Sequence, residues 1–334
     1  MAENDKHPAN PDLAKIRERI DEIDERIQSL INERARFAQQ VGLSKGKLAS
    51  AVEYYRPERE AEVLRAIQAR NEGPIRDDEM LRLFREIMSA CLAQQEPLKV
   101  GFLGPEGTFT QTAVYKHFGH SVRALPFHTI DEIFHEVESG VADFGVVPIE
   151  NSTEGSVNNT LDMFLTSPLK IAGEIELKIE QHLLGSETGL DKIERICAHE
   201  QSLAQCRSWL REYLPHAELI GMSSNAAGAR RARDEAGTAA IGPAVAADVY
   251  DLEVLVSNIE DRADNATRFL VIGRKLLAAS GSDKTTILVS TSDTGEGAGV
   301  LHQLLQPLAE HGVSMTRIES RPSRRRNWDY VFFI

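Results

Sequence analysis

The sequence has little cysteine and no long hydrophobic run. Among its 334 residues only Cys91, Cys197 and Cys206 are cysteines, and none forms a Cys-x-x-Cys pair. This usage favours a reducing compartment and argues against disulfides and zinc. No apolar run approaches the about eighteen residues of a membrane-spanning helix, and the N-terminal stretch MAENDKHPANPD lacks the apolar segment of a secretory signal. We therefore expect a cytoplasmic protein.

Charge and motifs exclude further classes of protein. The formal net charge of −13 is a poor match for nucleic acid or for an anionic membrane. No two histidines have the spacing of a metal site, and the turn GPEGTFT (104–110) fits neither a P-loop nor a G-x-G-x-x-G motif. We therefore expect no metal, nucleotide or flavin, and a protein that works without a cofactor.

After ten residues expected to be disordered, the pattern predicts a long helix from residue 11 to about 42. Its apolar residues recur at steps of three and four. They are Leu13, Ile16, Ile20, Ile23, Ile27, Leu30, Phe37 and Val41. At about 1.5 Å per residue this helix is roughly 45–50 Å long, which exceeds the core of a small domain. We infer a homodimer or higher homo-oligomer through this helix; packing along the same chain is the alternative.

One position of that apolar stripe is an arginine, Arg34. An unpaired buried arginine is costly, so Arg34 needs an anion. A snorkelling side chain or an interhelix salt bridge would also explain it. However, Lys45 follows on the same face, a second helix from Pro57 turns Glu60 inward, and a third helix carries Gln95 four residues after Cys91. Several polar groups thus converge on an apolar bundle that ends near residue 96.

From Leu98 the pattern changes to short apolar strands that alternate with helices, which predicts an α/β region with mostly parallel sheets over residues 97–277. We expect two lobes with a ligand cleft between them. Residues 278–334 then read as β-α-β-β, the first two thirds of a ferredoxin-like unit. Because the sequence stops within the third strand, YVFFI (330–334) is expected to form an exposed apolar edge.

The helical region resembles the all-helical class of chorismate mutase, a dimer with interlocked long helices. The resemblance covers residues 11–96 and implies a chorismate site that needs no nucleophile or metal. Arginines would clamp two carboxylates, Lys45 and Gln95 would stabilise charge on the ether oxygen, and Glu60 would hold the ring hydroxyl. The implied site residues are Arg34, Lys45, Arg59, Glu60, Cys91 and Gln95, with Arg17 from the partner chain. Arg56 and Cys91 stand where the family often has Asp and Ser.

Three motifs of the α/β region, GPEGTFT, VPIENSTEGSV (147–157) and NATRF (265–269), together resemble prephenate dehydratase. The resemblance implies a site between two lobes of the periplasmic-binding-protein kind. Thr267 would be the general acid for the departing hydroxyl, because aromatisation makes the demand for a proton high. Arg268 and Asn151 would bind carboxylates, and Glu150, Gln205 and Phe269 would complete the pocket. Alternatively, the Asn and Ser residues only cap a helix, and Thr267 only begins a strand.

The C-terminal motifs GAGVLHQLL (297–305) and ESRP (319–322) resemble the phenylalanine-sensing ACT domain. The resemblance implies a phenylalanine site with the residues Gly299, Val300, Leu301, Glu319, Ser320, Arg321 and Pro322. A complete ACT unit has a further helix and strand, so this unit is expected to be partial. An ordinary hairpin corner is the alternative.

Taken together, these resemblances imply a bifunctional enzyme of phenylalanine biosynthesis. It would rearrange chorismate to prephenate and convert prephenate to phenylpyruvate by decarboxylation and dehydration, with phenylalanine as feedback inhibitor. Two alternatives stay open. One is a dehydratase that acts on arogenate, and the other is a non-catalytic amino-acid sensor.

Overall fold

The computed structural model describes residues 11–45, 55–186, 189–290, 299–325, 327 and 329–334. The chain divides into two compact units. One draws on Met1–Arg56, Val63–Leu98 and Phe118–Val122, and the other on Pro57–Glu62, Lys99–His117 and Arg123–Ile334. Nowhere in the described ranges does a helix combine the length and the apolar character that crossing a membrane requires.

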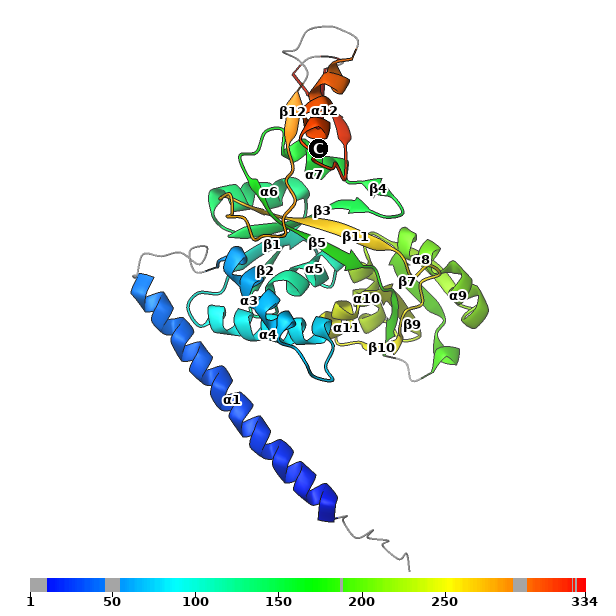
Figure 1. Ribbon diagram of the computed structural model, residues 1–334. Helices are drawn as coiled ribbons and strands as arrows, with labels where there is room; N and C mark the ends of the chain where they lie inside the picture. Colours follow the sequence, from blue (N-terminus) through cyan, green and yellow to red (C-terminus); the bar gives the residue numbers. More distant parts are fainter. Residues whose placement is uncertain (1–10, 46–54, 187–188, 291–298, 326, 328) are drawn as a thin grey trace, which may run out of the picture. The chain divides into compact units, whose positions relative to one another are not determined.

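The helical region contains α1 (Pro11–Lys45), α3 (Pro57–Ala69) and α4 (Asp77–Ala93). The start of α3 at Pro57 and the acidic first turn of α4 follow the usual preferences of helix N-termini. The three predicted helices are thus confirmed (Figure 1). The apolar stripe of α1 is left 42–60% exposed in the single chain. Gln95 lies beyond the end of α4 in a turn, so its predicted place on that helix is wrong.

The first sheet of the α/β region has the strand order β2-β1-β3-β11-β5, with β4 paired to β3 (Figure 1). Its strands are β1 (Lys99–Leu103), β2 (Arg123–Phe127), β3 (Phe144–Asn151), β4 (Gly155–Ser156), β5 (Lys170–Lys178) and β11 (Ala266–Gly273). The helices of the same region are α5 (Phe109–Phe118), α6 (Ile130–Ser139) and α7 (Asn158–Met163). Thr129 caps α6 by accepting from the backbone of Glu132, and Gly140 ends it in a left-handed conformation.

The second sheet has the order β10-β6-β9-β7-β8. Its strands are β6 (His182–Gly185), β7 (Arg195–His199), β8 (Glu218–Met222), β9 (Thr238–Gly242) and β10 (Glu253–Val256). Its helices are η1 (Leu190–Lys192), α8 (Glu200–Gln205), α9 (Arg207–Tyr213), α10 (Asn225–Asp234) and α11 (Ala244–Tyr250). Helix α10 packs so closely against β7 that a Cβ at position 228 would meet the carbonyl oxygen of Cys197 at 2.2 Å. Gly228 therefore allows this close approach.

The two predicted α/β lobes are therefore present as two sheets, but the expectation of mostly parallel strands is wrong. Strand β1 runs parallel to β2 and β3, and β7 runs parallel to β8 and β9. In contrast, β11 is antiparallel to both β3 and β5, and β6 is antiparallel to β9 and β10. The antiparallel strands arise where the chain crosses from one sheet to the other and returns.

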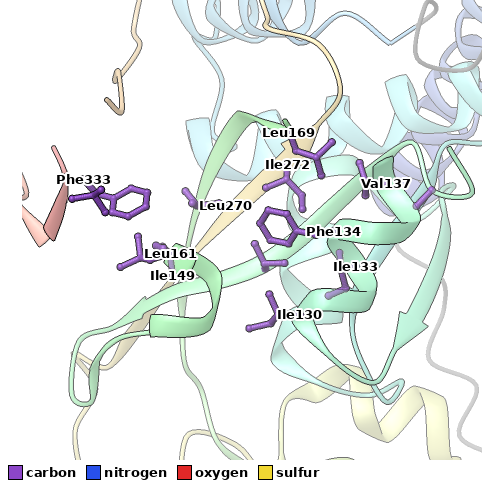
Figure 2. Close-up of a cluster of buried hydrophobic side chains, with 13 residues drawn as sticks. Ile130, Ile133, Phe134, Val137, Ile149, Leu161, Leu169, Leu270, Ile272 and Phe333 are labelled. Atoms are coloured by element: carbon purple, nitrogen blue, oxygen red, sulfur yellow. The ribbon is translucent and has the colours of Figure 1, made fainter. Parts of the chain in front are cut away.

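The C-terminal part contains β12 (Leu288–Ser290), α12 (Val300–Glu310), β13 (Glu319–Pro322) and β14 (Tyr330–Phe333), so the predicted β-α-β-β order is confirmed. The sheet order is β12-β14-β13, which makes β14 the central strand. The expectation that this segment forms an exposed edge is therefore wrong. Val331 and Phe333 are buried in one hydrophobic cluster with Leu161 and Leu270 of the first α/β lobe (Figure 2).

Candidate active sites

Two segments connect the sheets of the α/β region, and they lie side by side. One follows β5 and the other precedes β11. The backbone N–H of Ile179 donates to the carbonyl of Asn265 at 2.9 Å, and that of Ile259 donates to the carbonyl of Gln181 at 2.8 Å. Thr267 lies two residues after this junction. The fold therefore places the predicted acid where the two lobes join, which is where ligands of two-lobed folds bind.

The strand register pairs Thr267 of β11 directly with Asn151 of β3. The side-chain amide of Asn151 donates from Nδ2 to Thr267 Oγ1 at 2.8 Å. The orientation of this amide is fixed by its other end, because Asn151 Oδ1 accepts from the backbone N–H of Thr153 at 2.9 Å and of Glu154 at 3.2 Å. Since the threonine oxygen acts as an acceptor here, its own hydrogen is directed away from Asn151 and is free to be donated.

Asn265 completes this arrangement, although the sequence analysis did not identify it as a site residue. It is 5% exposed, and its Oδ1 accepts from Asn151 Nδ2 and from Ser152 Oγ, each at 3.2 Å. Asn265 and Thr267 are two residues apart and are both reached by the same amide. The motif NATRF contained Asn265, and its position two residues before Thr267, just ahead of β11, was the signal that could have found it.

Arg268 and Glu150 form the next pair of the same register. Arg268 donates to Glu150 Oε2 at 2.9 Å, and its Nε lies 2.8 Å from Glu174 Oε1. Successive residues of a strand point to opposite faces of the sheet. Thr267 and Arg268 therefore face opposite sides, so the structure does not bring the predicted carboxylate ligand to the predicted acid. Glu174 was missed because nothing in the sequence pairs β5 with β11.

The other predicted dehydratase residues lie in both lobes. Phe269 is buried in β11, at 2% exposure. Gln205 ends α8 in the second lobe, where its Oε1 accepts from Gln181 Nε2 at 3.0 Å. Gln181 also donates to Ser202 at 3.2 Å. A buried polar cluster therefore orients Gln205. Ala198, which stands where the prephenate dehydratases that this region resembles often have serine, is fully buried in β7.

The predicted chorismate residues are only partly assembled in one chain. Arg34 is half-buried and Arg17 is exposed on α1, whereas the side chain of Lys45 lies outside the described residues. Gln95 donates to the carbonyl of Ala38 at 2.9 Å, and its Oε1 is buried without a hydrogen-bond partner. A Cβ at Gly42 would meet that oxygen at 2.5 Å, so the glycine makes room for Gln95.

The remaining residues of this set lie at or just before α3 and on α4. Arg59 is exposed and pairs with Glu62 at 2.8 Å, three residues along α3. Glu60 is half-buried on the same helix, and Cys91 is 3% exposed on α4. Arg56 is exposed just before α3.

The residues predicted to bind phenylalanine lie in two places, at the start of α12 and on β13. Gly299 precedes α12 with a φ of 89°, which glycine adopts without strain, and Val300 and Leu301 begin the helix. Glu319 instead contacts Ser156 and Arg317, while Arg321 binds Asp162 through two hydrogen bonds of 2.8 and 2.9 Å. Ser320 and Pro322 are exposed on β13.

These features define a class: a two-lobed α/β enzyme, with a threonine held by an asparagine at the lobe junction and with helical and C-terminal additions. Three family models match the chain in order. Chorismate mutase type II matches residues 16–96, prephenate dehydratase 100–276 and the ACT domain 296–334. Among the described residues, no three His, Cys, Asp or Glu gather as a metal site would require.

Relatives of similar length carry the same combination. A bifunctional chorismate mutase/prephenate dehydratase of Stutzerimonas stutzeri is 53% identical over 96% of this chain and 88% of its own length, and that of Pseudomonas aeruginosa is 52% identical with the same coverage. A crystal structure of prephenate dehydratase from Arthrobacter aurescens in complex with L-Phe has a TM-score of 0.62 and 34% identity, covering 71% of this chain and 79% of that one. The chain belongs to the bifunctional chorismate mutase/prephenate dehydratase family.

Proposed function

We propose that this chain catalyses two consecutive reactions, from chorismate to prephenate and from prephenate to phenylpyruvate. We assign the first reaction to residues 11–96 and the second to 97–277, with 278–334 as the regulatory part. The membership of the family supports both activities. The single structural observation that supports the second activity is the hydrogen bond from Asn151 to Thr267.

In the dehydratase reaction, prephenate loses carbon dioxide and its ring hydroxyl together, and the product ring becomes aromatic. The chain has to hold the dianion and supply a proton to the leaving oxygen. Asn151 donates to one of the two lone pairs of the Thr267 hydroxyl oxygen, which leaves the O–H free to donate toward the substrate. We propose that Gln205 and Phe269 complete the prephenate pocket.

In the mutase reaction, one molecule rearranges, so the chain acts by holding the reactive conformer and stabilising developing charge. We propose that Arg34, Lys45, Arg59, Glu60, Cys91 and Gln95 form the site, with Arg17 from a second chain. The exposed apolar stripe of α1 supports a homodimer, since burying it against a second copy would remove a large apolar surface from water.

The test is an assay of both reactions on the same preparations. We expect Arg34→Ala to abolish the mutase reaction and to spare the dehydratase reaction, whereas Thr267→Ala does the reverse. Arg36→Ala, a neighbouring exposed arginine, is the control for the first change. The two-site assignment fails if either substitution silences both reactions in a folded protein. Turnover of arogenate against prephenate identifies the preferred substrate of the second site.

We further propose phenylalanine as the effector, because the ACT model matches the C-terminal part and a relative is known in complex with L-Phe. Titration calorimetry with phenylalanine tests this, and the absence of heat together with unchanged dehydratase activity would retire it. A non-catalytic sensor would bind the amino acid but turn over neither substrate.

A further inference from the structure

Arg268 is held by two carboxylates, and each of them is shared with a cation that follows β11 in the sequence. Glu150 Oε2 lies 2.9 Å from Arg268 and 3.6 Å from Arg317. Glu174 Oε1 lies 2.8 Å from Arg268 and 3.1 Å from Lys284. Arg317 lies two residues before the start of β13, and Lys284 lies between β11 and β12. The strand that carries Thr267 is therefore tied on both sides to the C-terminal part.

The charges in this network balance. Arg268, Arg317 and Lys284 face Glu150, Glu174 and, through a hydrogen bond of 3.2 Å from Arg317, also Glu319. All these side chains except Lys284 are only 22–34% exposed. Partial burial reduces solvent screening, so these pairs are stronger than the fully exposed ion pairs of the surface. The hydrogen bond from Ser156 lowers the pKa of Glu319, which keeps that member ionised.

Independent contacts hold the C-terminal part in place around this network. Arg321 and Arg324 both bind Asp162, which is only 10% exposed at its side chain. Val331 and Phe333 are buried in the hydrophobic cluster that includes Leu270 (Figure 2). Leu270 is two residues from Arg268 on β11, so the apolar and the ionic contacts fall on the same face of this strand.

The ionic pair and the catalytic pair are direct chain neighbours. Arg268 follows Thr267 on β11, and Glu150 precedes Asn151 on β3. Any shift of the Arg268–Glu150 pair along the strands therefore displaces the Asn151–Thr267 hydrogen bond on the opposite face. A misplacement of about 1 Å is enough to cost a catalytic group about a hundredfold in rate.

We propose that Arg317 and Lys284 are positioning residues of the dehydratase reaction, which act by holding Glu150 and Glu174 on Arg268 and thereby fix the strand at Thr267. This inference rests on the proposed role of Thr267 as the acid. It gives Arg268 the role of a link to the C-terminal part in place of the predicted role of a substrate ligand. The C-terminal part can thus affect the position of Thr267 without contacting prephenate.

The experiment compares Arg317→Met with Arg324→Met in the full-length chain. Both residues are arginines of the C-terminal part, but Arg324 binds Asp162, which Arg321 continues to hold, and not Glu150 or Glu319 as Arg317 does. We expect Arg317→Met to lower the dehydratase kcat about tenfold to a hundredfold, with a smaller change in KM. Arg317→Lys should recover part of the loss, and Arg324→Met should leave kcat unchanged. The mutase rate, measured on the same samples, should stay constant.

A double-mutant cycle completes the test. If Arg317 acts through Arg268, then Arg268→Met alone and the double variant should have similar kcat values, because the two residues belong to one network. Lys284→Met, at an exposed position, keeps the test possible if Arg317→Met does not fold. An unchanged kcat in Arg317→Met and Lys284→Met, or a pure rise in KM in Arg268→Met, overturns the inference. Full dehydratase activity in Thr267→Ala would overturn the proposed function instead.

Discussion

The amide of Asn151 donates to the hydroxyl oxygen of Thr267 at 2.8 Å, while two backbone N–H groups fix the other end of that amide. The direction of this hydrogen bond decides what the threonine can do. A donor beside the oxygen leaves the threonine proton for the substrate, whereas an acceptor in the same place would take that proton itself.

Asn151→Asp reverses this direction with almost no change in shape. The carboxylate keeps the two backbone contacts but accepts from Thr267, so we expect the dehydratase rate to fall by about a hundredfold or more. Asn159→Asp, an exposed residue of α7, is the control for added negative charge. Steady-state rates with prephenate measure the effect. An Asp variant as fast as the control would refute the role of Thr267 as a proton donor.

Gly42→Ala tests the proposed role of Gln95 in the mutase reaction without replacing Gln95 itself. The new Cβ would lie 2.5 Å from Gln95 Oε1, so the flexible amide has to move. We expect the mutase rate to fall at least tenfold while the temperature of unfolding stays nearly constant, since alanine also favours the helix. Gln95→Glu should also lack mutase activity at neutral pH. A Gly42→Ala variant with full mutase activity would show that Gln95 takes no part in the reaction.

Leu30→Glu tests the dimer proposed through α1. Leu30 is 60% exposed in the single chain and lies on the apolar stripe. A carboxylate there would be buried in the proposed interface, which is costly. We expect light scattering to report a monomer and the mutase reaction to be lost, because Arg17 of a second chain is then absent. Gln39→Glu, on the opposite side of the helix, should change neither. An unaltered dimer in Leu30→Glu would place the interface elsewhere.

The buried His182 leads to a prediction of how the stability of the folded state depends on pH. Burial lowers the pKa of His182, and its Nδ1 accepts from the backbone N–H of Asn258 at 3.3 Å. The folded state therefore disfavours the proton that the unfolded state takes up near its ordinary pKa of about 6.5. The contribution to stability is complete above that pH and is lost as the pH falls toward the lower folded value.

Chemical unfolding between pH 5 and 8, a range chosen around the ordinary histidine pKa of about 6.5, measures this effect. His182→Asn keeps an acceptor for Asn258 but does not titrate, so its stability should vary less with pH than that of the parent. The exposed His216→Asn should behave like the parent. Equal pH dependence in His182→Asn would mean that another group is responsible.

The sequence predicted well what depends on local periodicity. The apolar stripe of α1, the three helices and most strands of the α/β region follow from spacing along the chain. Other features could not be predicted because they depend on residues far apart in the sequence. Strand β5 alternates charged and apolar residues, and its place beside β11 is set by the return of the chain from the second lobe. The same holds for β14, whose central position buries Val331 and Phe333.

The amino-acid sequence by itself determined the domain order, the helical stripe with Arg34 and the motif that contains Thr267. Only the tertiary structure decided the partners of these residues. The register of β3 with β11 set Asn151 against Thr267 and Glu150 against Arg268, and the alternation of the strand put the two pairs on opposite faces. Adjacent residues of one motif thus face different surroundings, because the direction of each side chain is fixed by the sheet and not by its neighbours in the sequence.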